Sequence, residues 1–104
     1  MPVSTIANAK VCLSERHSNP CDNINLTYKL YGEEIFEQNV GKTEIFSIFI
    51  SIDNNGSAND ITLTDIARDK AKALELFGIF ADGDVDPCSA PYIIEELLCR
   101  SEYL

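Results

Sequence analysis

The sequence predicts an α+β fold: an antiparallel sheet of three to four strands, with two C-terminal helices packed on one face. Three observations support this fold. Apolar and polar residues alternate over 24–31 and 45–52, as they do in half-buried strands. An Asn55-Gly56 pair follows the second segment, where a hairpin turn is expected. Apolar residues then recur at helical spacing over 66–81 and 89–102.

The first alternating segment, residues 24–31, forms a strand with one apolar row. That row consists of Ile24, Leu26, Tyr28 and Leu30. We expect the strand to continue through Ile35 and Phe36, with a bend or an interruption at Gly32. Upstream, residues 9–13 predict a weak strand. Residues 14–23 are rich in Ser, Asn and Asp, contain Pro20 and predict a loop.

The second alternating segment, residues 45–52, predicts the strongest strand. One face carries Phe46, Ile48, Ile50 and Ile52. Ile45 and Phe49 lie on the opposite face, together with serines. Because both faces carry apolar groups, this strand is expected at the centre of the sheet.

The Asn55-Gly56 pair predicts a two-residue turn, since both residues tolerate positive φ. Residue 54 then lies opposite residue 57, and the register of the hairpin follows. This register faces two apolar pairs, Ile50 with Ile61 and Ile48 with Leu63. A longer loop over 53–59 is the alternative.

The first helix is expected over 66–81. Its apolar stripe consists of Ala67, Ala71, Leu74 and Phe77. Asp82-Gly83 should end it, with Gly83 in a left-handed conformation.

The second helix is expected over 89–102, with Asp86 or Ser89 as its cap. Pro87 or Pro91 fits its first turn. Its buried side should consist of Ile93, Ile94, Leu97 and Leu98, joined by Tyr92 and Leu104.

Length and composition indicate one domain over residues 1–104, with residues 1–8 expected to be disordered. The start lacks a basic segment followed by an apolar one, and no apolar run is long enough to span a membrane. We therefore expect a cytoplasmic protein without membrane contacts.

The chain is acidic, with 17 acidic and 8 basic residues and a net charge of −9. Such a charge repels phosphates, so nucleic-acid binding is not expected. Between Asp82 and Glu96 there are five acids and no base. This acidic surface favours solubility, and a basic partner is the alternative interpretation.

No catalytic constellation is visible, and we expect no enzyme. The single histidine, His17, lies in a polar segment, and the sequence contains no Gly-x-Ser-x-Gly elbow. The glycine-rich loops that bind phosphate are also missing.

We expect no cofactor and no metal, although Cys12, His17 and Cys21 are the candidate zinc ligands. Cys88 or Cys99 would complete the set, but the spacing matches no established zinc motif. A Cys12–Cys21 disulfide is another alternative. In a reducing compartment the thiols stay free, with Cys99 and Cys12 as small core residues.

Two surfaces are candidates for contact with a partner. One is the acidic segment formed by Asp82, Asp84 and Asp86. Its alternating acids imitate a calcium loop, but Pro87 and Ile93 occupy the two diagnostic positions, so calcium is not expected. The other surface is the sheet face bearing Ile45 and Phe49, if no helix covers it; an apolar patch there would suit a protein partner or a homodimer.

Three segments carry a family resemblance over about residues 24–98. They are Thr27-Tyr28-Lys29-Leu30, Asp65-Ile66 with Asp69-Lys70, and the segment from Val85 through Pro87 to Leu98. These segments resemble a small family of Gram-positive anaerobes, known only as a domain of unknown function. The resemblance implies a few antiparallel strands followed by two helices, and a bacterial protein. It implies no activity.

Taken together, the sequence predicts a small soluble non-enzymatic module for protein interaction or regulation. The alternative is an acidic inhibitor, or nucleic-acid mimic, that binds a basic partner. A metal-binding protein that uses the cysteines and His17 ranks third.

Overall fold

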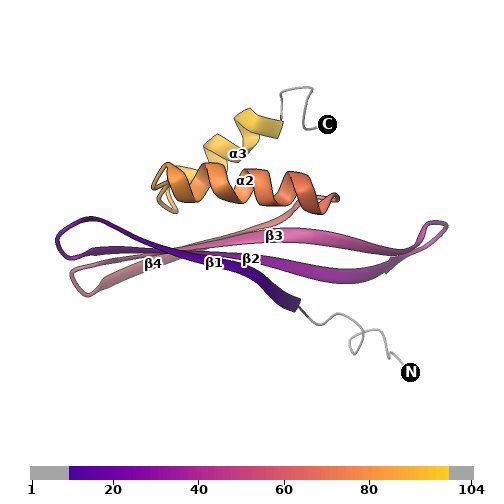
Figure 1. The fold of residues 1–104 in the computed structure, drawn as a ribbon, viewed down its shortest axis with the longest axis horizontal. Helices are drawn as coiled ribbons and strands as arrows, with labels where there is room; N and C mark the ends of the chain where they lie inside the picture. Colours follow the sequence, from indigo (N-terminus) through magenta and orange to yellow (C-terminus); the bar gives the residue numbers. More distant parts are fainter. Residues whose placement is uncertain (1–9, 99–104) are drawn as a thin grey trace.

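The computed structural model describes residues 10–98, and the fold is an antiparallel four-stranded sheet with two helices (Figure 1). The strands are β1 (Lys10–Cys21), β2 (Ile24–Glu37), β3 (Gly41–Asn54) and β4 (Ser57–Ala67). They lie side by side in sequence order, β1-β2-β3-β4. Residues 1–8, for which disorder was expected, lie outside the described residues.

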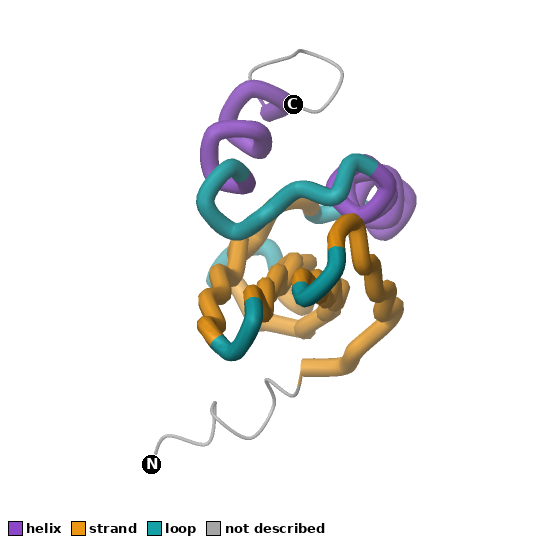
Figure 2. The backbone as a smooth tube through the Cα atoms, turned by 90° about the vertical axis from the view of Figure 1, so that its left-hand side faces the viewer, coloured by secondary structure: helices purple, strands orange, loops and turns teal. Residues whose placement is uncertain are grey.

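Helices α2 (Lys70–Asp82) and α3 (Ala90–Leu98) lie on the same face of the sheet. Figure 2 shows this arrangement from the end of the sheet, with both helices on one side of the strands. The predicted α+β fold is therefore confirmed. No helix in residues 10–98 is long and apolar enough to cross a membrane.

The core lies between the sheet and the helices, because the apolar rows of β2 and β3 point toward α2 and α3. Its strand members are Leu26, Tyr28, Leu30, Phe46, Ile48, Ile50, Leu63 and Ile66. Its helical members are Ala73, Leu76, Phe77, Phe80, Ala81, Ala90, Ile94 and Leu97. Alternate side chains of a strand share one face, so this row explains why both helices cover the same side.

The predicted β3–β4 hairpin is confirmed in its register. Asn54 lies opposite Ser57, and the two apolar pairs are Ile50 with Ile61 and Ile48 with Leu63. Asn55 and Gly56 form the turn with φ angles of 54° and 90°. The turn residues thus determine which side chains face the helices.

The loop predicted over residues 14–23 is wrong, because β1 extends from Lys10 to Cys21. β1 is an edge strand of the described sheet, and neither of its faces is deeply buried. Such a strand needs no apolar alternation, and an edge position tolerates Pro20. Backbone pairing with β2, which runs from Lys10↔Glu33 to Cys21↔Ile24, holds it in place. The predicted continuation of this strand through Ile35 and Phe36 is confirmed, since β2 runs without interruption past Gly32 to Glu37.

A bulge near the end of β4 explains why the first helix starts later than predicted. Four residue steps from Leu63 to Ala67 match two steps from Ile48 to Phe46, so β4 contains two extra residues there. Asp65 adopts a φ of 55° within the bulge. Ile66, expected in the helix, therefore belongs to the strand and faces the core with 6% of its surface exposed.

The buried face of α2 also differs from the predicted stripe. Of the four residues expected to be buried, only Phe77 is buried at the core side of the helix; Leu74 is 42% exposed. The buried positions are Ala73, Leu76, Phe77, Phe80 and Ala81. Once the helix starts at Lys70, this is the face that meets the sheet.

Helix α2 ends at Asp82 as predicted, but Gly83 is not the left-handed residue. Its φ is −90°, and Asp84 has the positive φ of 51°. The Val85 N–H donates to the Phe80 carbonyl at 3.1 Å, which closes the last turn of the helix. Asp86 then accepts a hydrogen bond from the Ser89 N–H at 2.8 Å just before α3.

The buried side of α3 consists of Ala90, Ile94 and Leu97, whereas Tyr92 is 75% exposed and does not join the core as expected. The predicted end of this helix, and the predictions for Cys99 and Leu104, fall outside the described residues.

Tyr28 links the sheet to the α2–α3 connection. Its side chain is fully buried, and its hydroxyl donates to the Val85 carbonyl at 2.8 Å. Burial, followed by the nearby Asp84 and Asp86 carboxylates, raises the pKa of Tyr28 from 10.0 to about 12, against an opposing effect of Arg16. The phenol therefore stays protonated in the folded chain at pH values where an exposed phenol ionises.

Replacing Tyr28 with Phe should make folding less sensitive to alkaline pH. The unfolded chain loses the phenol proton near pH 10, while the folded chain keeps it until about pH 12, so Tyr28 destabilises the fold as the pH rises through this interval. We expect Y28F to lose about 1 kcal/mol at neutral pH through the missing hydrogen bond. Urea unfolding between neutral pH and pH 11 measures both effects.

The matched control is Y92F, which removes the hydroxyl of an exposed tyrosine. It should behave as the wild type throughout. If Y28F and the wild type lose stability equally between neutral pH and pH 11, the buried phenol does not carry the effect.

Candidate functional site

The β2–β3 hairpin extends beyond the rest of the sheet (Figure 1). The described part of β1 starts at Lys10, opposite Glu33, and β4 ends at Ala67, opposite Phe46. Residues 34–44 therefore form strand pairs only with one another within the described part of the chain. We call this segment the β2–β3 arm. With four cross-strand pairs and a turn, it reaches roughly 15 Å past the last four-stranded position.

The tip of the β2–β3 arm exposes large apolar side chains. Phe36 is 81% exposed and Val40 is 69% exposed. Single exposed apolar residues are common on protein surfaces, but here an aromatic and an aliphatic residue occur together on a projecting hairpin. The tip therefore offers an apolar contact that no described part of the chain covers.

The turn at the tip has a defined geometry. The Val40 N–H donates to the Glu37 carbonyl at 3.2 Å. Asn39 and Gly41 adopt positive φ values of 74° and 92°, which these residue types tolerate. The local sequence thus fixes where Val40 stands relative to Phe36.

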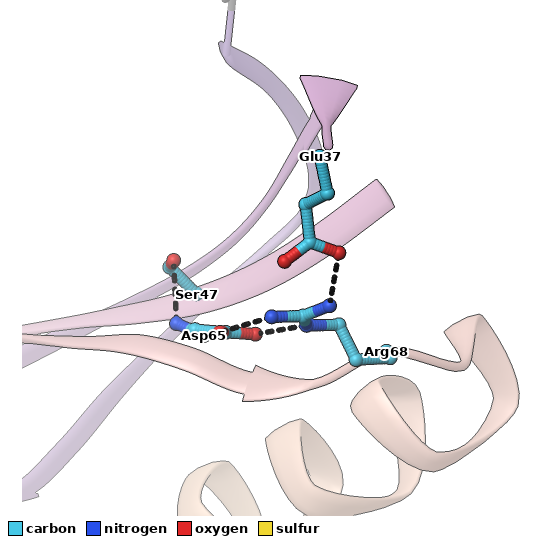
Figure 3. Close-up of polar contacts among 4 residues, drawn as sticks. All are labelled: Glu37, Ser47, Asp65 and Arg68. Atoms are coloured by element: carbon cyan, nitrogen blue, oxygen red, sulfur yellow. Dashed lines mark hydrogen bonds and ion pairs between the residues drawn. The ribbon is translucent and has the colours of Figure 1, made fainter. Parts of the chain in front are cut away.

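Arg68 connects the outer end of the β2–β3 arm, at Glu37, to the end of β4 (Figure 3). Its guanidinium donates two hydrogen bonds to Asp65, at 2.8 and 2.9 Å, and one to Glu37, at 3.1 Å. The hydrogen bonds that Arg68 donates to Asp65 and Glu37 raise its pKa above its usual range, so the side chain stays charged. One cation thereby connects β2 to the bulge in β4.

Ser47 completes this junction from β3. Its side chain is only 3% exposed, and its hydroxyl oxygen accepts a hydrogen bond from the Asp65 N–H at 3.3 Å. The bond satisfies a backbone donor that the bulge removes from regular pairing. The direction of the arm is thus set by contacts from three strands and the β4–α2 connection.

A hollow of about 580 Å³ lies beside this junction, at the start of α2. Ile66, Ala67 and Leu98 provide its apolar lining, and Arg68 and Lys72 lie at its side. Arg68 already binds Asp65 and Glu37, so its charge is compensated. We assign no ligand to this hollow.

The candidate zinc ligands do not come together. Cys12, His17 and Cys21 all lie on β1, which is extended, and Cys12 and Cys21 are therefore roughly 30 Å apart. A shared metal site would require the chain between Cys12 and Cys21 to fold back on itself, and so would a disulfide between them. This segment is an extended strand instead. Cys12 is exposed, not a core residue. No described group of three or more His, Cys, Asp and Glu side chains has the arrangement of a metal site.

His17 takes part in a short polar chain across β1 and β2. Its Nε2 lies 2.8 Å from Glu15 Oε2, and its Nδ1 lies 3.3 Å from Thr27 Oγ1. An acid, an imidazole and a hydroxyl in line are the parts of a proton relay. The His17 side chain is 64% exposed, however, and none of the three residues lines the hollow at α2. A general base acts on a substrate held beside it, so we assign these contacts to strand pairing.

The predicted acidic surface is engaged with its neighbours in the fold. Asp82 pairs with Arg16 at 2.7 Å, and Asp84 accepts a hydrogen bond from the Ser18 hydroxyl. Asp86 caps the turn before α3, as described above. These contacts link the α2–α3 connection to β1, so each acid has a structural partner.

The sheet face bearing Ile45 and Phe49 is the face opposite to α2 and α3. No described helix covers it, yet Ile45 is only 8% exposed and Phe49 is half-buried. The apolar patch considered for this face is therefore not exposed at Ile45. The exposed apolar surface of this part of the chain lies at Phe36 and Val40.

Sequence reasoning did not select these two residues. Phe36 was expected only as the continuation of a strand, and Val40 received no role. A local signal exists in retrospect, since Val40 lies between Asn39 and Gly41 in a turn, where polar residues are usual, and Phe36 lies just before that turn.

Replacing Arg68 with Gln should loosen the β2–β3 arm without unfolding the chain. The substitution removes the contacts with Glu37 and Asp65, and exposed ion pairs contribute little to global stability. We expect faster amide hydrogen exchange over residues 35–44 and an unchanged rate in the core of β3. R16Q, which breaks only the Asp82 pair, is the control and should leave arm exchange unaltered. Equal exchange in R68Q and the wild type would show that Arg68 does not anchor the arm.

Comparison with known proteins gives one family match and no closer relative. No curated protein and no solved structure matches the chain significantly. The family match covers residues 8–100, which include the whole sheet, both helices and the β2–β3 arm. The chain therefore belongs to the family described as "Family of unknown function (DUF6514)".

Proposed function

We propose that this chain is a non-enzymatic module for protein interaction or regulation, and that the β2–β3 arm is its contact element. The observation that carries the proposal is the 81% exposure of Phe36 on a hairpin that projects from the sheet. A folded chain gains nothing from an aromatic side chain held in water. A partner that buries it gains roughly 1.5–3 kcal/mol.

The position of the tip also suits a contact element. Aromatic side chains are enriched among the residues that dominate binding energy. Val40 lies on the turn that follows Phe36 and is also exposed, so a partner that binds the tip can bury both side chains. Arg68 holds the arm at Glu37, next to the tip turn, which reduces the entropy lost on binding.

The alternative of an acidic inhibitor that acts through Asp82, Asp84 and Asp86 is less well supported. Each of these acids already has a partner within the fold. The metal-binding alternative is weaker still, because Cys12 and Cys21 lie far apart on one strand.

The proposal includes a cytoplasmic, bacterial setting, with a protein as the partner. Exposed thiols at Cys12, Cys21 and Cys88 suit a reducing compartment. The net charge of −9 disfavours nucleic acids and anionic membrane surfaces as partners.

The double variant F36S/V40S tests the proposal. Both side chains are exposed, so we expect the same circular-dichroism spectrum and the same unfolding transition as in the wild type. Affinity capture from a lysate of the source organism, followed by quantitative mass spectrometry, should yield a protein that the wild type retains. F36S/V40S should retain it at least about tenfold less.

The matched control is Y92S on α3, because Tyr92 is 75% exposed and lies outside the arm. It should capture the same protein as the wild type. If F36S/V40S and the wild type capture the same proteins in the same amounts, the proposal is contradicted.

A further inference from the structure

We infer that the β2–β3 arm recognises a basic–apolar segment of its partner, in which a cationic side chain lies between Glu34 and Glu44 and an apolar side chain packs on Phe36. This inference rests on the proposed function and adds the chemistry of the partner. It follows from the order of residues on one face of the arm.

Two cross-strand pairs follow one another on this face. Glu34 lies opposite Glu44, and Phe36 lies opposite Lys42. Even-numbered residues of β2 and β3 share the face that carries Leu30 and Phe46, so all four side chains lie on the helix side of the sheet. The arm extends past the start of α2, and this part of the face is left without a helix above it (Figure 1).

The opposed acids are unfavourable for the hairpin itself. Like charges directly opposite each other destabilise a strand pair, and a two-stranded ribbon has little stability to lose. Lys42 Nζ approaches Glu34 at 3.8 Å, with both side chains more than half exposed. No cation among the described residues pairs with Glu44. A cation from a partner would relieve this repulsion.

The adjacent aromatic side chain narrows the chemistry of the partner. A guanidinium can donate hydrogen bonds to two carboxylates and also stack on an aromatic ring, so arginine fits Glu34, Glu44 and Phe36 better than lysine does. To bury Phe36 and Val40, the partner must also present an apolar side chain next to that cation. The partner segment therefore combines Arg, or Lys, with an adjacent apolar residue.

A second copy of this chain is a poorer occupant. Each copy carries a net charge of −9, and the arm contributes three acids, Glu34, Glu37 and Glu44, against one base, Lys42. Two arms would bring like charges together. A competing explanation is that the acids only keep an exposed hairpin from aggregating. That explanation leaves the exposed Phe36 and Val40 without a role.

A random-peptide phage library selected against the folded full-length chain tests the inference. Phage that also bind F36S/V40S are removed first. That variant has the same charge as the wild type, so this step discards peptides attracted by acidity alone. We expect the remaining peptides to place Arg or Lys beside an apolar residue.

The affinity of a selected synthetic peptide should then fall by about fivefold or more in E34Q/E44Q. It should also fall as the salt concentration rises from about 50 mM to about 500 mM. E95Q/E96Q on α3 makes the same change in net charge away from the arm and should bind as the wild type does. E34Q/E44Q should remain folded, with unfolding no easier than in the wild type, since it removes a repulsion.

The outcomes distinguish failure of this inference from failure of the proposed contact element. Peptides that need Phe36 and Val40 but carry no basic residue, or bind E34Q/E44Q equally well, overturn the inference and leave the contact element standing. A library that yields no peptide dependent on Phe36 and Val40 counts against both. An E34Q/E44Q variant that aggregates but binds normally assigns the acids to solubility. Arm-dependent dimerisation of the wild type in sedimentation would replace the basic partner with a second copy.

Discussion

The bulge in β4 determines where the sheet stops, and much of the molecule depends on it. The positive φ of Asp65 allows Ile66 to face the core, after which β4 ends at Ala67 and α2 begins at Lys70. Because the fourth strand ends there, β2 and β3 continue outward with no described neighbour. Asp65 also binds Arg68, which holds Glu37. The same residue, Asp65, thus belongs to the bulge that ends the sheet and to the contacts that hold the arm.

The sequence was most informative where a local rule and a tertiary contact agree. Asn55-Gly56 fixes the turn, and the apolar pair Ile48 and Leu63 lies on the face that the helices cover, so turn and core select the same register. The sequence of β1 shows no such pattern, because backbone hydrogen bonds to β2 hold this strand and its side chains need not alternate between apolar and polar. The start of α2 was misplaced because helical spacing alone does not reveal that Ile66 pairs within a bulged strand.

The candidate site was harder to predict, for a physical reason. The projection of the arm past β4 depends on where β4 ends, and that end is set by residues far away in the sequence, such as Asp65. Phe36 looked like an ordinary strand residue because its local pattern is the same in a sheet interior and in a free hairpin. The candidate ligands on β1 failed for the converse reason. Cys12, His17 and Cys21 are close in the sequence, but the extended strand β1 holds them far apart in space.

The order of the strands has a consequence for the speed of folding. Each strand pairs with the one that precedes or follows it in the chain, so every ladder can grow outward from a short turn. Closing such short loops costs little chain entropy, and topologies rich in local contacts fold faster than those with distant pairings. The sheet can therefore form hairpin by hairpin, while α2 and α3 gain their packing surface only when the apolar row of β2 and β3 is in place. The β2–β3 arm shares its turn with the central ladder, so this ladder can grow from the tip of the arm toward the four-stranded part of the sheet.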